Sequence, residues 1–129
     1  MENTSGEKFF YSEDYAIRGA IFDVYRTLGC GFLESVYQES LEIEFGLRRI
    51  PFISQKVLQL QYKGILLKHT YKPDFILYGK IIMEIKSTSD LTLAHQAQLL
   101  NYLSSTGMQI GYLVNFGHYP KAEIIRLRK

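Results

Sequence analysis

Residues 73–86 have the sequence PDFILYGKIIMEIK, in which two apolar runs flank a short Tyr-Gly-Lys segment. Two such runs around a short glycine-containing segment are typical of an antiparallel β-hairpin. A three-residue turn pairs Leu77 with Ile81, and the same register sets Asp74 opposite Glu84. The stretch therefore predicts two neighbouring strands that carry a pair of carboxylates at the end away from the turn.

The predicted pair of carboxylates needs a positive charge nearby. Residues that face each other across antiparallel strands lie ~4.5 to 5.5 Å apart at Cβ, where like charges are destabilising. Because side chains alternate along a strand, Lys86 lies on the same face as Glu84. Carboxylate oxygens suit Mg²⁺ or Mn²⁺, and such an ion lowers the pKa of a bound water. An ammonium group beside that water orients it and offsets charge on a phosphate.

A Glu-x-Lys pattern by itself has a simpler explanation, because on most amphipathic strands these residues form the solvated face. Polar residues at helical spacing in two other segments argue against that explanation here. These residues are His95, Gln98 and Tyr102 in one segment and Glu34, Tyr37 and Gln38 in the other. The first set lies in a stretch, residues 91–120, that contains no Asp, Glu, Lys or Arg.

Outside the hairpin, apolar residues at helical spacing predict three helices. Their expected ranges are Ser12 to Leu28, about Leu33 to Arg48, and about Thr92 to Ser105. The second helix is expected to bury Val36, Leu41, Ile43 and Phe45.

Strands are expected on both sides of the last helix. A hairpin between Ile53 and Leu67 is expected in the same sheet as residues 73–86, and strands at 110–116 and 122–127 end the chain. The order ααβββαββ predicts an α/β sandwich with a central mixed β-sheet flanked by helices.

The composition indicates one globular domain over residues 1–129, since 47% of the 129 residues are hydrophobic. Residues 1–11 are expected to be flexible. A net charge of +2 and a pI near 8.6 permit contact with a polyanion without arguing for it. The single cysteine, Cys30, excludes an internal disulfide. Without a secretion signal or a run of the ~20 apolar residues that a span requires, a cytoplasmic, non-membrane protein is expected.

Four motifs in this chain resemble those of a known group of proteins. The run Gly31-Phe32-Leu33-Glu34-Ser35-Val36-Tyr37 fits the pattern that names the GxxExxY protein family, which is grouped with the PD-(D/E)XK nuclease superfamily. Pro73-Asp74, followed after a turn by Glu84-Ile85-Lys86, resembles the superfamily signature. Gln98-Leu99-Leu100-Asn101-Tyr102 is similar to a helix motif of its exonuclease-like branch, and Asn115-Phe116-Gly117 resembles the family's late strand.

The resemblance extends over residues 12–127 and implies a restriction-endonuclease-like sandwich with phosphodiesterase activity. It assigns metal ligation to Asp74, Glu84, the Ile85 carbonyl and Glu34. It assigns the positioning of the attacking water to Lys86, the orientation of the site to Gln98, and support or phosphate contact to Tyr37 and Tyr102. His95 lies on the Gln98 face, where it either contacts substrate or packs and caps the helix.

The resulting hypothesis is a nuclease that uses Mg²⁺ or Mn²⁺ to hydrolyse phosphodiester bonds of nucleic acid, with DNA favoured over RNA. A homodimer is expected because so small a domain presents limited surface to a duplex. One alternative is a catalytically silent module of the same fold that binds nucleic acid or protein, although the repulsive carboxylate pair argues against it. A second alternative is an accidental match in an unrelated α/β protein.

Overall fold

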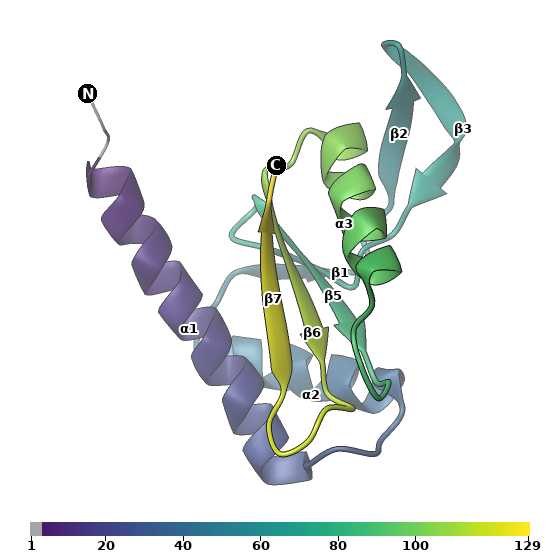
Figure 1. The fold of residues 1–129 in the computed structure, drawn as a ribbon. Helices are drawn as coiled ribbons and strands as arrows, with labels where there is room; N and C mark the ends of the chain where they lie inside the picture. The colour runs from purple at the N-terminus through teal and green to yellow at the C-terminus, as the bar shows by residue number, and fades with distance from the viewer. Residues whose placement is uncertain (1–3) are drawn as a thin grey trace.

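The main sheet is centred on strand β5. Its strand order is β1 (Phe52–Ser54), β4 (Phe75–Leu77), β5 (Ile81–Lys86), β6 (Ile110–Asn115) and β7 (Glu123–Arg128). The computed structural model describes the chain from Thr4 onward and its side chains from Phe10 onward. Strand β5 pairs antiparallel with β4 and parallel with β6, so the sheet is mixed, as predicted (Figure 1). Its two outer pairs are antiparallel.

The two strands before β4 form a separate hairpin, which corrects one expectation. Strands β2 (Leu58–Tyr62) and β3 (Ile65–Tyr71) pair only with each other, and the hairpin projects from the body beside α3 (Leu93–Thr106) (Figure 1). Leu58 and Leu60 pack against the cluster beneath α3 instead of extending the main sheet. The middle block therefore has five strands where the predicted order had three, while the predicted fold class is confirmed.

The helices follow the predicted ranges with one difference at the first. Helix α1 (Thr4–Leu28) begins before Ser12, and residues 1–3 lie outside the described part. The flexibility expected of residues 1–11 stays a prediction. Helix α2 (Glu34–Leu47) agrees with the prediction. Its buried residues are Tyr37, Leu41 and Phe45, whereas Ile43 is 59% exposed, because the buried stripe follows a spacing of four and leaves Ile43 on the outer side.

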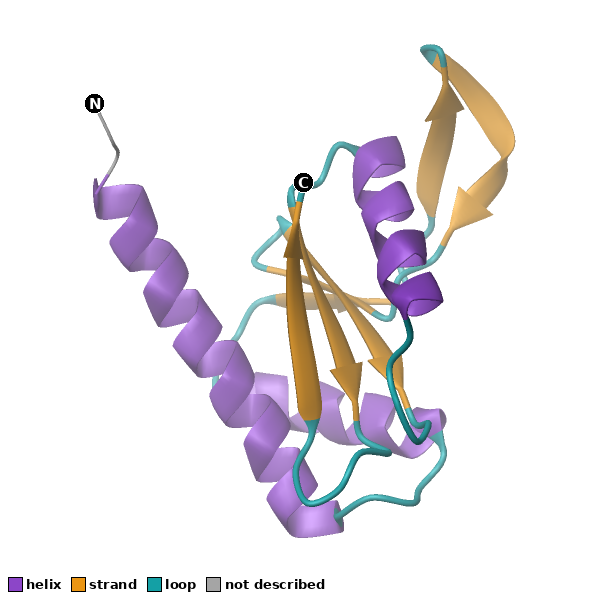
Figure 2. Ribbon diagram, in the orientation of Figure 1, coloured by secondary structure: helices purple, strands orange, loops and turns teal. Residues whose placement is uncertain are grey.

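Two hydrophobic clusters cover the two faces of the main sheet. Helices α1 and α2 pack on one face (Figure 2), where they meet Ile81, Met83 and Ile85 of β5. Helix α3 packs on the other face, where it meets Ile82. The alternation predicted for β5 is therefore confirmed. Ile82, Glu84 and Lys86 lie on the α3 side of the strand.

Helix α3 forms the crossover between the parallel strands β5 and β6 and has defined ends. The Thr92 hydroxyl accepts from the His95 backbone N–H at its start, and Gly107 ends it in a left-handed conformation, with φ of 78°. Across the described residues, no helix has the length and apolar character needed to cross a membrane.

Candidate active site

The hairpin of β4 and β5 has the register predicted from its turn. Leu77 pairs with Ile81 and Phe75 pairs with Met83, so the next residue outward, Asp74, lies beside Glu84. The Asp74 backbone N–H donates to Glu84 Oε1 at 3.2 Å. The structure therefore brings together the two acidic residues that the sequence placed opposite each other.

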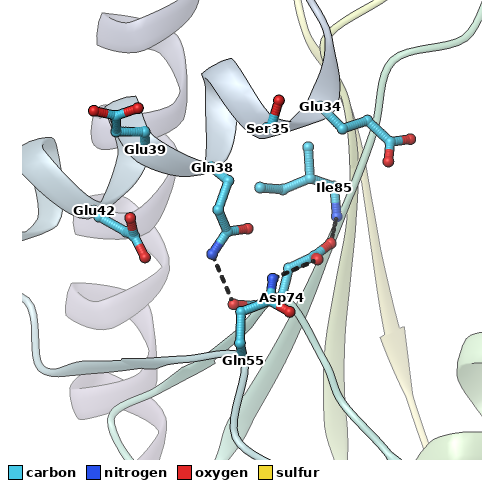
Figure 3. A pocket seen from close by; sticks show the side chains of 8 residues that line it. All are labelled: Glu34, Ser35, Gln38, Glu39, Glu42, Gln55, Asp74 and Ile85. Carbon is cyan, nitrogen blue, oxygen red and sulfur yellow. Dashed lines mark hydrogen bonds between the residues drawn. The ribbon is translucent and has the colours of Figure 1, made fainter.

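Asp74 is held by hydrogen bonds on both its side chain and its backbone (Figure 3). Its Oδ2 accepts from the Ile85 backbone N–H at 2.7 Å, and its Oδ1 accepts from Gln55 Nε2 at 3.3 Å. Its carbonyl oxygen accepts from Gln38 Nε2 on α2 at 3.1 Å. Burial nevertheless raises the pKa of the Asp74 carboxyl group, and the charge of Glu34 acts in the same direction.

Glu84 is half-buried between β5 and α3. Its Oε1 accepts from the Tyr71 hydroxyl at 2.6 Å, and the Tyr71 ring stacks on Tyr102 of α3 with centroids 3.7 Å apart. Burial, and then the charge of Asp74, raises the pKa of Glu84 to about 7. The surrounding protein therefore does not fully compensate the negative charge of the Glu84 carboxylate.

Lys86 lies next to the polar face of α3. A narrow cleft of about 10 Å³, room for about one water molecule, is lined by Glu84, Lys86, His95, Gln98, Leu99, Tyr102 and Leu113. The positive charge of Lys86 lowers the pKa of both Asp74 and Glu84, although it is a minor contribution for each. The three residues predicted to share one face of α3, His95, Gln98 and Tyr102, thus all line the cleft that contains Glu84 and Lys86.

A larger cleft opens on the other side of Asp74, against α2 (Figure 3). It has a volume of about 560 Å³ and is lined by Glu34, Ser35, Gln38, Glu39, Glu42, Gln55, Asp74 and Ile85. Glu34 is exposed at the start of α2, close enough for its charge to raise the pKa of Asp74. Asp74 therefore lines the cleft on the α2 side, whereas Glu84 lines the cleft on the α3 side.

Tyr37 does not lie in either cleft, which corrects its predicted contact with substrate. The side chain is fully buried, its hydroxyl donates to the Gly29 carbonyl at 2.6 Å, and its ring stacks on Phe116 at 4.3 Å. Tyr37 supports the site only by holding the turn before α2 against the core. The cause is the four-residue spacing of the buried stripe, which takes Tyr37 inward and leaves Glu34 and Gln38 at the cleft.

His95 has the capping role that was one of its two predicted alternatives. Its Nδ1 accepts from the Thr92 backbone N–H at 3.1 Å, which completes the reciprocal cap at the start of α3. The ring also lines the narrow cleft, so capping holds it beside Lys86 and Gln98.

The late-strand motif anchors the loop that follows Lys86. Asn115 is fully buried, and its Oδ1 accepts from the backbone N–H groups of Thr88 at 3.1 Å and Gly117 at 2.9 Å. A Cβ atom at Gly117 would lie 2.3 Å from the Thr88 carbonyl oxygen, so no larger residue fits there. This motif stabilises the loop after Lys86, at the end of β5 that lies away from the β4–β5 turn.

Three residues contact the acidic pair in ways that the sequence did not predict: Gln38, Gln55 and Tyr71. The helical spacing predicts Gln38 on a polar face, and in the structure its amide holds the Asp74 backbone. Gln55 and Tyr71 lie near the two ends of the β2–β3 hairpin, so their distance to the site depends on where this hairpin joins the body. For Tyr71 alone the sequence offered a signal of proximity to the site, because the residue lies shortly before Pro73-Asp74.

The donor set suits a small divalent cation without forming a complete cage. Among the residues that the structure describes, no three Asp, Glu, His or Cys side chains are gathered closely enough to hold a metal ion. Mg²⁺ commonly uses only one or two carboxylates and keeps waters in its remaining positions. Asp74 and Glu84 supply two such carboxylates, and the raised pKa of both groups is typical of a site that needs a cation.

Comparisons with known proteins identify the family of the chain and a similar fold. Residues 11–127 match the profile of the PD-(D/E)XK nuclease superfamily. No curated protein matches the sequence. The crystal structure of SSO0001 is similar in fold, with a TM-score of 0.57 and 19% identity; the match covers 74% of this chain, which spans about half of the length of SSO0001. The matched profile covers nearly the whole chain, and the protein belongs to the PD-(D/E)XK nuclease superfamily.

Proposed function

We propose that this protein is a Mg²⁺- or Mn²⁺-dependent nuclease that hydrolyses phosphodiester bonds with an activated water. The observation that carries this proposal is the meeting of Asp74 and Glu84 at the open end of the β4–β5 hairpin, with Lys86 on the same strand. Burial raises the pKa of both carboxyl groups, and a neighbouring carboxylate adds to the effect: Glu34 for Asp74, and Asp74 for Glu84. A core or solvated face has no need of this arrangement, whereas a cation-dependent site does.

Asp74, Glu84 and the Ile85 carbonyl would hold the ion. When bound, the ion supplies Lewis-acid activation of water and neutralises charge on the phosphate. The hydrogen bonds from Ile85 and Gln55 fix the Asp74 carboxylate, and the Tyr71 hydroxyl fixes that of Glu84. These bonds orient the donor oxygens before substrate arrives, which lowers the entropic cost of assembling the site. Glu34, across the larger cleft from Asp74, is placed to act through a water or as an additional ligand.

Lys86 and Gln98 act on the attacking water and on the phosphate. The ammonium group of Lys86 donates to the water and offsets negative charge that grows on the phosphate oxygens. Gln98 projects from α3 into the cleft that contains Lys86, where its amide orients the reacting groups. Tyr102 and His95 line the same cleft and are the predicted contacts to the substrate phosphate.

The proposed substrate is nucleic acid, with DNA favoured over RNA. Membership of the GxxExxY family within the superfamily, a cytoplasmic location and a homodimeric state also remain predictions. Two of these are tested separately from catalysis: polymer preference by competition between DNA and RNA substrates, and oligomeric state by light scattering.

The decisive test is a cleavage assay with labelled DNA and RNA, single- and double-stranded, in Mg²⁺, Mn²⁺ or EDTA. We expect cleavage that requires the divalent ion and falls by about 100-fold or more in Asp74→Asn and Glu84→Gln. Asp90→Asn, which changes an exposed acid outside both clefts, is the matched control and retains activity. Absence of cleavage with every polymer and metal would favour the silent module, and cleavage that survives Asp74→Asn would exclude this site.

A further inference from the structure

The β2–β3 hairpin is an exposed arm attached to the site by its base. Every residue from 61 to 70 is exposed, and the hairpin projects past α3 away from the main sheet (Figure 1). At its base, Tyr71 ends β3, donates to Glu84 and stacks on Tyr102. The arm is therefore joined directly to one of the two acidic residues of the site.

The arm and the residues that flank it carry charge of one sign only. Residues 55–73 contain four lysines, Lys56, Lys63, Lys68 and Lys72, and no Asp or Glu. The rest of the chain contains the other eleven of the fifteen basic residues and all thirteen acidic residues. All four lysines are exposed, and none forms an ion pair with a residue in the described part of the chain. The overall charge of +2 thus hides a positive arm on a body with a net negative charge.

The body beside the arm explains why a basic element is needed. The larger cleft next to Asp74 is lined by Glu34, Glu39 and Glu42, so it repels a phosphate backbone. By contrast, the arm projects on the α3 side, where Glu84, Lys86 and Gln98 line the narrow cleft. A polyanion is therefore attracted toward the arm and the α3 side of the site, and away from α2.

The tip of the arm combines charge with exposed apolar side chains. Lys63 occupies the turn with φ of 50°, and its ammonium lies 5.4 Å from the centre of the Tyr62 ring. Tyr62, Ile65 and Leu66 are 60%, 68% and 56% exposed. An aromatic ring and aliphatic side chains between lysines offer stacking or wedging contacts to bases together with contacts to phosphates.

We propose that the β2–β3 hairpin is the nucleic-acid-binding arm of this protein, which holds the phosphate backbone through its lysines and presents the strand to Glu84 and Lys86. The proposal deepens the proposed nuclease function and rests on it for the identity of the ligand. The partner is nucleic acid because the arm offers several unneutralised positive charges without a single acceptor carboxylate, as a polyanion requires.

The test measures binding without cleavage, by fluorescence anisotropy of a labelled DNA duplex and of its single strand in EDTA. The variant is Lys63→Asn with Lys68→Ser, in which Asn tolerates the left-handed conformation at position 63. We expect about tenfold weaker binding or more, and a slope of log affinity against log salt that falls by about two, one for each lost phosphate contact. Cleavage in Mg²⁺ should fall through KM more than through kcat.

The matched control is Lys121→Ser with Lys129→Ser, which removes the same charge from exposed positions near the C-terminal strand. Ile65→Ser with Leu66→Ser tests the apolar tip and should weaken binding without changing the salt slope. If both lysine variants lower affinity equally, or if the arm variants change only self-association, the arm is not the binding element. Hairpin-dependent binding with no cleavage would overturn the proposed nuclease and leave the arm standing, whereas unchanged binding by an active enzyme would overturn the arm alone.

Discussion

The two faces of β5 differ in what they contribute, although their residues alternate along one short strand. Ile81, Met83 and Ile85 are at most 2% exposed and pack into the core under α1 and α2. On the other face only Ile82 is buried in a hydrophobic cluster, and Glu84 and Lys86 follow it as half-buried charges. One face stabilises the fold by apolar burial, while the other keeps the carboxyl group of Glu84 where burial disfavours its charge.

This difference teaches that stability and chemistry can be separated by a single step along the chain. Substitutions on the core face should change the free energy of unfolding, and those on the α3 face should change activity, metal binding or the pH dependence of stability. Four substitutions test this division.

The largest effect is expected for Lys86→Ala on the α3 face. Loss of the ammonium removes the group that positions water and offsets phosphate charge, so the rate of cleavage should fall by about 10²- to 10⁴-fold. Thermal unfolding should stay close to that of the unmodified protein. Cleavage kinetics and calorimetry measure the two effects, with Lys121→Ala as the matched lysine control. Near-normal activity would break the division between the faces.

Met83→Ala should have the next largest effect, and on stability alone. The side chain is fully buried among the residues under α1 and α2, and its truncation leaves a cavity that costs about 2–5 kcal/mol. Denaturant titration measures this loss. Ile53→Ala, at a position of the same sheet that is 47% exposed, is the control and should cost less than about 1 kcal/mol. Comparable losses at both positions would mean that the core face is not tightly packed.

Glu84→Gln should stabilise the metal-free protein above neutral pH. The pKa of Glu84 is raised from 4.5 to about 7, so the folded state binds a proton that the unfolded state releases, and stability falls as pH rises between these values. Above pH 7 the variant lacks that penalty and should gain about 1–3 kcal/mol. Below pH 4.5 the difference disappears. Denaturant titrations in EDTA at pH 4 and pH 8.5 measure it, and a variant less stable than the parent at pH 8.5 would contradict a raised pKa.

The smallest effect is expected for Tyr71→Phe, which removes one hydrogen bond to Glu84 and keeps the ring that stacks on Tyr102. That bond lowers the pKa of Glu84, so its loss raises the pKa further and weakens Mg²⁺ binding at pH 7. The change should be about 0.5–1.5 kcal/mol in affinity, measured by calorimetry. Tyr62→Phe, on the exposed arm, is the control. If neither the Mg²⁺ affinity nor its pH dependence changed, Tyr71 would not act through Glu84.

Local patterns in the chain were enough to predict much of this structure. The hairpin register, the range of α2 and the Gly107 end of α3 all follow from side-chain period and turn chemistry. Each depends on residues a few positions apart, whose relative directions are set by the geometry of one helix or one strand pair.

Other features depend on how elements far apart in the chain pack together. The detachment of β2–β3 was decided by where Leu58 and Leu60 find apolar partners, and the inward position of Tyr37 by the side of α2 that meets the core. The hydrogen bonds from Gln38, Gln55 and Tyr71 reach residues that lie 13 to 36 positions away in the chain.

The sequence alone determined the composition of the site: an acidic pair joined by a tight hairpin, a lysine on the same strand and a polar helical face. Tertiary structure decided which groups surround that pair, how strongly burial raises the pKa of each carboxyl group, and which side of the site is acidic and which carries the basic arm. Periodicity is a property of a single segment, whereas desolvation and electrostatic interaction depend on every segment packed around a charge.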